Sequence, residues 1–241
     1  MEESTLNMRS ITLSFFLTLC CCQLNAQTQT GIFNIDDIRV SAERGDAEAQ
    51  FKLGQHYCSS TSGSDKNYVT AMKWMVKASN QGNLGATRMI GDFYELGWGV
   101  KKDMGTAIKY WRQAADKGDA QAQTQIGIMY LTGKKGSPNK TEAMKWLTLA
   151  LKQRHYTAAI NLSYWNENGL YGFKNDKVEA VKYMAIAIEF GMKGDQMNEK
   201  FEALKKSLTE EQRDEAKTRT KDFLATIPDQ KTPTNAKQLP K

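Results

Sequence analysis

Residues 84–119, LGATRMIGDFYELGWGVKKDMGTAIKYWRQAADKGD, decide the fold, because their pattern returns along the chain. The period is about 36 residues, which is typical of proteins built from repeated helical units. The recurring columns are Gly45, Gly82 and Gly118; Gly54, Gly91, Gly127 and then Ser163; Tyr57, Tyr94 and Tyr130; Ala71, Ala107, Ala143 and Ala180; Trp74, Tyr110, Trp146 and Tyr183; and Ala78, Ala114, Ala150 and Ala187. So many columns in one register predict a repeat protein.

Each unit has the pattern of two amphipathic helices joined by a loop. In the first unit Ala49, Leu53 and Tyr57 follow one another at i, i+4 and i+8, which places them on one face of a helix. A second stripe runs from Ala71 to Ala78. Neither helix can bury its stripe alone, so the units must stack. The sequence therefore predicts an all-α fold, a right-handed α/α solenoid of about four repeats with capping helices.

The ends of the predicted helices carry polar caps and glycines. Asn139 and Asp176 are each followed three residues later by glutamate, which is typical of the first residue before a helix. Asn67 and Asp103 occupy the equivalent positions in the other units. The column of Gly82 and Gly118 follows the second helices, where a left-handed backbone ends a helix.

A second glycine column, with Gly54, Gly91 and Gly127, falls inside the predicted first helices. Glycine at such a position costs about 1 kcal/mol relative to alanine. We expect this cost to be offset by close approach of the neighbouring helix, which leaves no room for a side chain.

Two segments carry a resemblance to a known family. Residues 42–50 (AERGDAEAQ), and the loop 96–103 (LGWGVKKD) leading to residues 107–115, resemble Sel-1-like repeats, which are related to tetratricopeptide units. The resemblance covers about residues 42–190, in four units. It implies a scaffold or adaptor that binds other proteins and has no chemistry of its own. Exported bacterial members include periplasmic immunity proteins that neutralise secreted antibacterial lipases.

The chain also departs from the family pattern. The first unit has residues 58–65 (CSSTSGSD) in place of a glycine-rich loop. In the fourth unit we expect His155 at the position of the helix-ending glycine, and Ser163 replaces the glycine inside the first helix.

The N-terminus has the features of an export signal. Arg9 precedes a short apolar run at residues 11–22, and a small residue, Ala26, ends the segment. We expect residues 1–26 to be cleaved, with Met8 a possible true start and an uncleaved anchor or a lipoprotein as alternatives. Cleavage places the protein in the periplasm or outside the cell and leaves no stable membrane span. It also leaves Cys58 as the one remaining cysteine, so no internal disulfide is expected.

The remaining parts of the chain are assigned as flanks of the repeats. Residues 27–41 are expected to form an N-terminal cap, 42–190 four repeats and 191–226 C-terminal capping helices that include the capping box at Thr209 and Gln212. Residues 227–241 are expected to form a disordered tail.

Few residues suggest chemistry. Two histidines, His56 and His155, lack the spacing of a metal site, and residues 127–135 have one residue too many for a phosphate-binding loop. We expect no catalytic residue, no cofactor and no metal. The formal charge is +6, and loss of residues 1–26 raises it to +7. In an exported protein this charge favours acidic proteins, lipid or wall polymers over nucleic acid.

The partner is expected to be another protein, such as a secreted effector or an envelope component, with a wall- or lipid-binding module as the alternative. Helical geometry places one set of first-helix positions opposite the core stripe, on the concave side of a solenoid. The predicted partner-binding residues are Phe51, Arg88, Asp92, Ile128, Leu131, Ile160, Tyr164 and Glu167. The alternative is that loops or the C-terminal helices cover this cluster.

Overall fold

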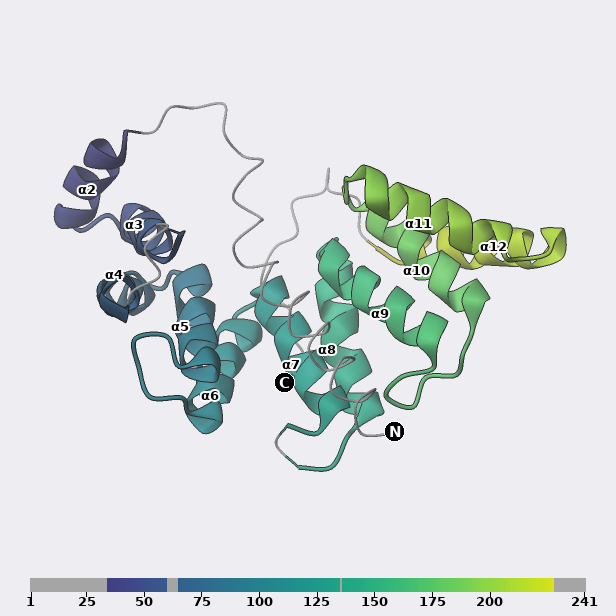
Figure 1. Cartoon of the computed structure of the whole chain (residues 1–241), viewed down its shortest axis with the longest axis horizontal. Coiled ribbons are helices and arrows are strands. Elements are labelled where there is room, and N and C mark those ends of the chain that lie inside the picture. Colours follow the sequence, from purple (N-terminus) through teal and green to yellow (C-terminus); the bar gives the residue numbers. More distant parts are fainter. Residues whose placement is uncertain (1–33, 60–64, 135, 228–241) are drawn as a thin grey trace, which may run out of the picture. The chain divides into compact units, whose positions relative to one another are not determined.

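A computed structural model describes residues 34–59, 65–134 and 136–227 (Figure 1). The expected signal peptide and most of the expected C-terminal tail lie outside these residues. The chain divides into two compact units, residues 1–103 and 104–241, and each is described by itself. Every regular element among the described residues is an α-helix.

In the described part of the first unit, four helices follow one another in sequence. They are α2 (Ile35–Glu43), α3 (Ala47–Ser59), α4 (Asp65–Asn80) and α5 (Leu84–Leu96). Each helix packs on the next one, so α3 contacts both α2 and α4, and α4 also contacts α5. Leu53, Met75 and Phe93 are completely buried between them. The Asn34 side chain accepts a hydrogen bond from the Asp36 N–H at 3.1 Å and so caps α2.

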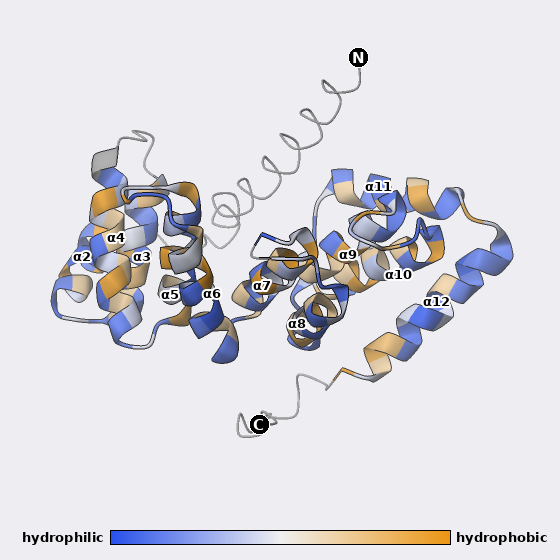
Figure 2. Cartoon of the chain, turned by 90° about the horizontal axis from the view of Figure 1, so that it is seen from below, coloured by the Kyte–Doolittle hydropathy of each residue, from blue (hydrophilic) through white to orange (hydrophobic). Residues whose placement is uncertain are grey.

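Seven helices make up the second unit as far as the structure describes it. They are α6 (Met104–Asp116), α7 (Ala120–Thr132), α8 (Lys140–Lys152), α9 (Tyr156–Asn168), α10 (Lys177–Glu189), α11 (Asp195–Lys206) and α12 (Glu210–Ala225). The closest pairs are α7 with α8 and α9 with α10, which are the two helices of single repeats. The last helix, α12, packs on α10 and is mostly hydrophilic in Figure 2. That polarity suits a helix at the end of a stack.

Most of the predicted helix ends are confirmed. Asn139 and Asp176 accept hydrogen bonds from the backbone N–H groups three residues later, at 3.0 and 2.9 Å. The capping box of Thr209 and Gln212 is present at the start of α12. The prediction for Asn67 is wrong, because α4 begins two residues earlier, at Asp65. The first repeat, whose loop before this helix differs in sequence from the other loops, therefore has a longer second helix than the later repeats.

The glycines that follow second helices are left-handed, as predicted, with φ of 89° at Gly82 and 99° at Gly118. The fourth member of this column is Arg154, with φ of 58°, and the expectation that it is His155 is wrong by one residue. His155 instead occupies the N-cap position of α9, where Asn83 and Asp119 cap α5 and α7. Its side chain makes no capping hydrogen bond.

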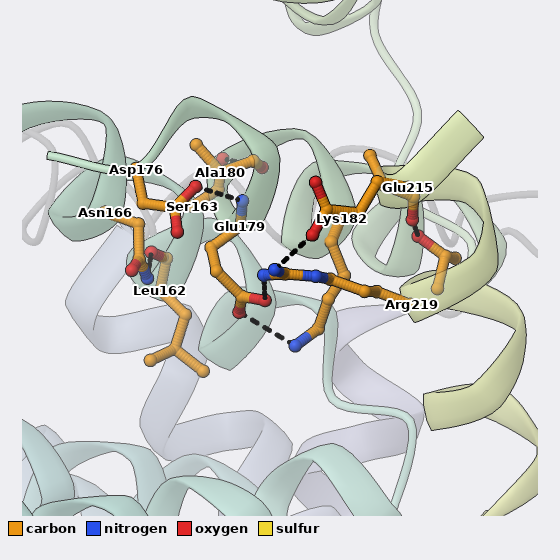
Figure 3. A network of polar contacts seen from close by, with 11 residues as sticks. Leu162, Ser163, Asn166, Asp176, Glu179, Ala180, Lys182, Glu215 and Arg219 are labelled. Atoms are coloured by element: carbon orange, nitrogen blue, oxygen red, sulfur yellow. Dashed lines mark hydrogen bonds and ion pairs between the residues drawn. The ribbon is translucent and has the colours of Figure 1, made fainter. Parts of the chain in front are cut away.

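Two of the glycines inside first helices, Gly54 and Gly127, lie against the second helix of the same repeat, as predicted. A Cβ atom at Gly127 would lie 2.7 Å from Leu147 Cγ and 3.3 Å from the Ala143 carbonyl oxygen. At the same position of the fourth repeat, Ser163 donates a hydrogen bond to the Ala180 carbonyl oxygen at 2.8 Å (Figure 3). The serine is accommodated because its hydroxyl satisfies the carbonyl that faces glycine elsewhere.

A network of charged side chains joins α10 to α12 (Figure 3). Glu179 accepts hydrogen bonds from Lys182 at 2.8 Å and from Arg219 at 2.7 Å, and Arg219 also binds Glu215. Beside the network, burial and the nearby charge of Glu179 raise the pKa of Tyr183 to about 12. These contacts hold the last helix against the repeats.

Candidate protein-binding site

The structure buries the predicted centre of the binding surface. Ile128 and Leu131 are 8% and 1% exposed and belong to the main core of the second unit. The expectation that they are exposed is wrong, because α7 packs against α8 on one side and against α9 on another. A first helix inside a stack therefore has two buried faces.

The predicted residues of the first unit do not form an exposed rim. Arg88 and Asp92 form an ion pair at 3.1 Å, and their side chains are 14% and 6% exposed. Phe51 is half-buried, and its ring lies against Gly85, where a Cβ atom would be 2.8 Å away. The expectation that Asp92 lies on the surface is thus also wrong.

The predicted residues on α9 keep some contact with solvent. Ile160 and Tyr164 are half-buried and pack against the edge of the core. Glu167 forms an ion pair at 3.0 Å with Lys200 of α11, whose ammonium lies 5.4 Å from the centre of the Tyr164 ring. A helix of the C-terminal pair therefore lies beside this end of α9, and it adds a residue that the prediction lacked.

Tyr171, in the loop after α9, was also missed. Its backbone is left-handed, with φ of 53°, which costs a residue other than glycine about 1–2 kcal/mol. Two repeats earlier the same position is Gly99, with φ of 66°. This replacement of a repeat glycine by tyrosine could have been found by aligning the loops.

Tyr171 interacts with two aromatic residues of α9, electrostatically with Tyr164 and by ring contact with Trp165. Burial, with a smaller contribution from Tyr164, raises the pKa of Tyr171 above its ordinary value. The Tyr171 ring also meets Trp165 edge-on, with 5.9 Å between the ring centres. We call Tyr164, Glu167, Tyr171 and Lys200 the α9 tyrosine patch.

The α9 tyrosine patch carries residue types that are common at protein interfaces. Its two charges pair with each other, and its tyrosines offer flat apolar rings with a polar tip, a residue type enriched at protein interfaces. No group of three or more His, Cys, Asp or Glu side chains that could hold a metal ion occurs among the described residues. Within the same residues, no helix is both long enough and apolar enough to cross a membrane.

Comparison with protein families matches the Sel1 repeat to residues 47–83, 85–119, 120–155 and 157–189, more than half of the chain. The chain belongs to the Sel1 repeat family. Its fold is an all-α repeat solenoid, a scaffold suited to protein interaction.

Solved structures of Sel1 repeat proteins resemble the chain. A protective antigen of uropathogenic Escherichia coli strains with an SLR fold is 26% identical, with a TM-score of 0.63 over 88% of this chain and 44% of that one. A Sel1 repeat protein from Oxalobacter formigenes is also 26% identical, with a TM-score of 0.53 over 70% and 48% of the two chains. The chain spans less than half the length of either structure.

A more distant likeness is to an immunity protein from Pseudomonas aeruginosa, at 15% identity, with a TM-score of 0.39 over 75% of this chain and 83% of that one. The comparison with curated proteins found no match.

Proposed function

We propose that this Sel1 repeat protein is a non-catalytic scaffold that binds another protein in the periplasm or outside the cell. The observation that carries the proposal is Tyr171, a strained residue at a glycine position of the repeat. Strain of this kind is commonly retained at functional sites. The α9 tyrosine patch is then the contact surface for the partner.

Tyr171→Gly tests the proposal, because glycine suits the left-handed backbone and removes only the ring. The lost ring contact with Trp165 and the relieved strain oppose each other, so we expect a melting temperature close to that of the wild type. Arg154→Gly is the matched control, since it relieves the same strain outside the patch.

The measurement is capture of partners by the tagged chain from periplasm and from medium, at low and at moderate salt. We expect Tyr171→Gly to lose a protein that wild type and Arg154→Gly both retain. Retention of that protein by Tyr171→Gly would place the interface elsewhere. Loss of all capture at moderate salt would favour the wall- or lipid-binding alternative, whose attraction is mostly charge.

The same experiment bears on a narrower role. A secreted lipase among the captured proteins, inhibited by the wild type and not by Tyr171→Gly, would assign the chain as an immunity protein. An envelope component would assign it as an adaptor.

A further inference from the structure

One side of α4 is apolar and open to solvent. Among the described residues three large apolar side chains are exposed, and two of them, Val69 and Val76, lie on α4, at 40% and 37% exposure. They are seven residues apart, so they share one face of the helix, and half-buried Met72 lies between them. An open hollow on this side of α4 is lined by Thr70, Met72, Lys73, Trp74, Val76 and Lys77. We call Val69, Met72, Lys73 and Val76 the α4 valine face.

The repeat itself does not require these two valines. Counted from the alanine column that begins at Ala71, the two positions hold Val69 and Val76 in the first repeat, Gly105 and Arg112 in the second, Thr141 and Thr148 in the third, and Val178 and Ala185 in the fourth. The two middle repeats thus have glycine or a polar residue at both positions. Both positions are apolar only in the first and the fourth repeat.

In the fourth repeat a helix covers this face. Val178 and Val181, which align with Val69 and Met72, are 8% and 4% exposed and pack in one cluster with Leu204, Leu208 and Ala216. Ala216 belongs to α12, which packs on α10. The first repeat carries the same kind of apolar face, and the described part of the chain leaves its valines exposed. The chain therefore shows in its own fourth repeat what this face accommodates, which is a helix.

The charges of the α4 valine face differ from those of α10. On α10 an acidic residue, Glu179, accepts a hydrogen bond from Arg219 of the covering helix at 2.7 Å (Figure 3). The equivalent position on α4 is Thr70, and none of the described side chains that line the hollow is acidic. Its two charged residues, Lys73 and Lys77, are both positive. A helix that lies here is therefore complemented by acidic residues where α12 has arginine.

We propose that the α4 valine face binds an amphipathic helix of a partner protein, whose acidic residues lie beside Lys73 and Lys77. This inference goes beyond the proposed function, because the α9 tyrosine patch takes no part in it. Amphipathic helices bind such surfaces through apolar residues three, four and seven positions apart. Val69 and Val76 are two turns apart, about 10 Å along α4, so they match two turns of the bound helix.

Other occupants fit this face less well. A second copy of the chain, bound through the same face, would bring its own Lys73 and Lys77 against these lysines, and like charges at an interface are unfavourable. Residues 228–241 contain three prolines, and three lysines against one aspartate. Residues 27–33 are only seven in number and include no acidic residue. Neither segment has the sequence of an acidic amphipathic helix.

The test measures binding of labelled peptides to the full chain by fluorescence anisotropy. The first probe is an acetylated and amidated peptide of three copies of Ala-Glu-Leu-Leu-Glu-Glu-Leu, which places its leucines on one face of a helix. The second has lysine for every glutamate, and the third has the residues of the first in an order that spreads the leucines around the helix. We expect the first peptide to bind at least about tenfold more tightly than either of the others.

A double variant, Val69→Thr with Val76→Thr, gives the first repeat the two residues of the third. It should weaken binding of the first peptide about tenfold, because two methyl groups of the contact become hydroxyl groups. Both positions are exposed, so the melting temperature should stay close to that of the wild type. The matched control is Val40→Thr, which changes the exposed valine of α2 and should leave peptide binding unchanged.

A charge reversal tests the second part of the proposal. Lys73→Glu should weaken binding of the glutamate peptide and strengthen binding of the lysine peptide. The matched control is Lys109→Glu, which makes the same change at the same position of the second repeat, where the residue is also exposed. It should affect neither peptide, because its neighbours Gly105 and Arg112 offer no apolar face.

Equal binding of the three peptides, or unchanged binding by the folded double valine variant, would overturn the inference. The alternatives are checked by placing the photoreactive p-benzoylphenylalanine at position 76 of the full chain alone. A crosslinked dimer would assign the face to a second copy, and an internal crosslink to residues 27–33 or 228–241 would assign it to the chain itself. Either result would overturn the proposal. Tyr171→Gly should bind the first peptide as the wild type does, so this test stands apart from that of the proposed function.

Discussion

The packing of Gly127 against α8 gives a prediction that can be worked out from distances. In Gly127→Ala the new Cβ would lie 2.7 Å from Leu147 Cγ and 3.0 Å from Leu147 Cδ2. Real Cβ atoms do not approach other carbons so closely, so a neighbour has to move. Leu147 and Ala143 are both completely buried, and Leu147 Cγ is a branch point close to the backbone. The strain therefore passes to the α7–α8 contact itself.

The expected magnitude is a balance of two terms. Overpacking a core costs about 1–3 kcal/mol, whereas alanine is favoured over glycine inside a helix by about 1 kcal/mol. With little freedom for Leu147, we expect a net loss of about 2 kcal/mol. For a chain of this size that lowers the melting temperature by about 4–8 °C.

Gly54→Ala is the matched control, because it places the same atom at the same position of the first repeat. Its Cβ would lie 2.8 Å from Met75 Cε, the end of a flexible side chain, with the Ala71 carbonyl oxygen at 3.3 Å. Met75 can rotate away, so this variant should melt near or slightly above the wild type. Thermal melts, with hydrogen exchange resolved to each helix pair, provide the comparison. A Gly127→Ala variant as stable as Gly54→Ala would refute the packing argument.

Two further predictions concern the contact between α10 and α12. Glu179→Gln removes the negative charge that pairs with both Lys182 and Arg219. Hydrogen exchange in α12 should therefore become faster, by an amount equivalent to about 1 kcal/mol, and the change should be smaller in high salt. An effect that does not depend on salt would contradict this prediction. The folded chain keeps the Tyr183 proton up to a pKa of about 12, whereas the unfolded chain loses it near 10, so the free energy of unfolding should fall by about 2 kcal/mol between pH 10 and 12. A Tyr183→Phe variant should lack this part of the fall, and an identical pH profile would show the assigned pKa to be wrong.

The repeat and its helix pairs could be predicted because each depends on local features. The glycines at 54 and 127 are required by a contact within one repeat, and Asn139 and Asp176 cap helices through neighbours three residues away. Such features recur at a fixed period, so comparison of the units finds them. The one-residue error at His155 arose because the glycine column is occupied by Arg154 in the fourth repeat, so no glycine marks the position there.

The binding surface could not be predicted from one helix at a time. Helical periodicity identifies the face that is turned to the partner helix of the same repeat, but it does not show whether the opposite side is buried or exposed. In the folded chain part of that side, at Ile128 and Leu131, is buried as α7 packs against α9. The ion pair between Glu167 and Lys200 joins residues from two helices of which one lies outside the repeats, so no repeat column contains it.

Within the described ranges, two residues other than glycine are left-handed, and they show how a departure from the repeat can be interpreted. The strain at Arg154 is offset by contacts within the fold. Its guanidinium donates a hydrogen bond to the Glu189 carbonyl oxygen at 3.1 Å and lies 5.0 Å from the centre of the Phe190 ring. Tyr171 makes an edge contact with Trp165 and stays half-buried. The left-handed backbone at Arg154 thus stabilises the end of a helix, whereas the same conformation at Tyr171 holds a tyrosine at the surface. That difference makes Tyr171, and not Arg154, the residue on which a functional test should begin.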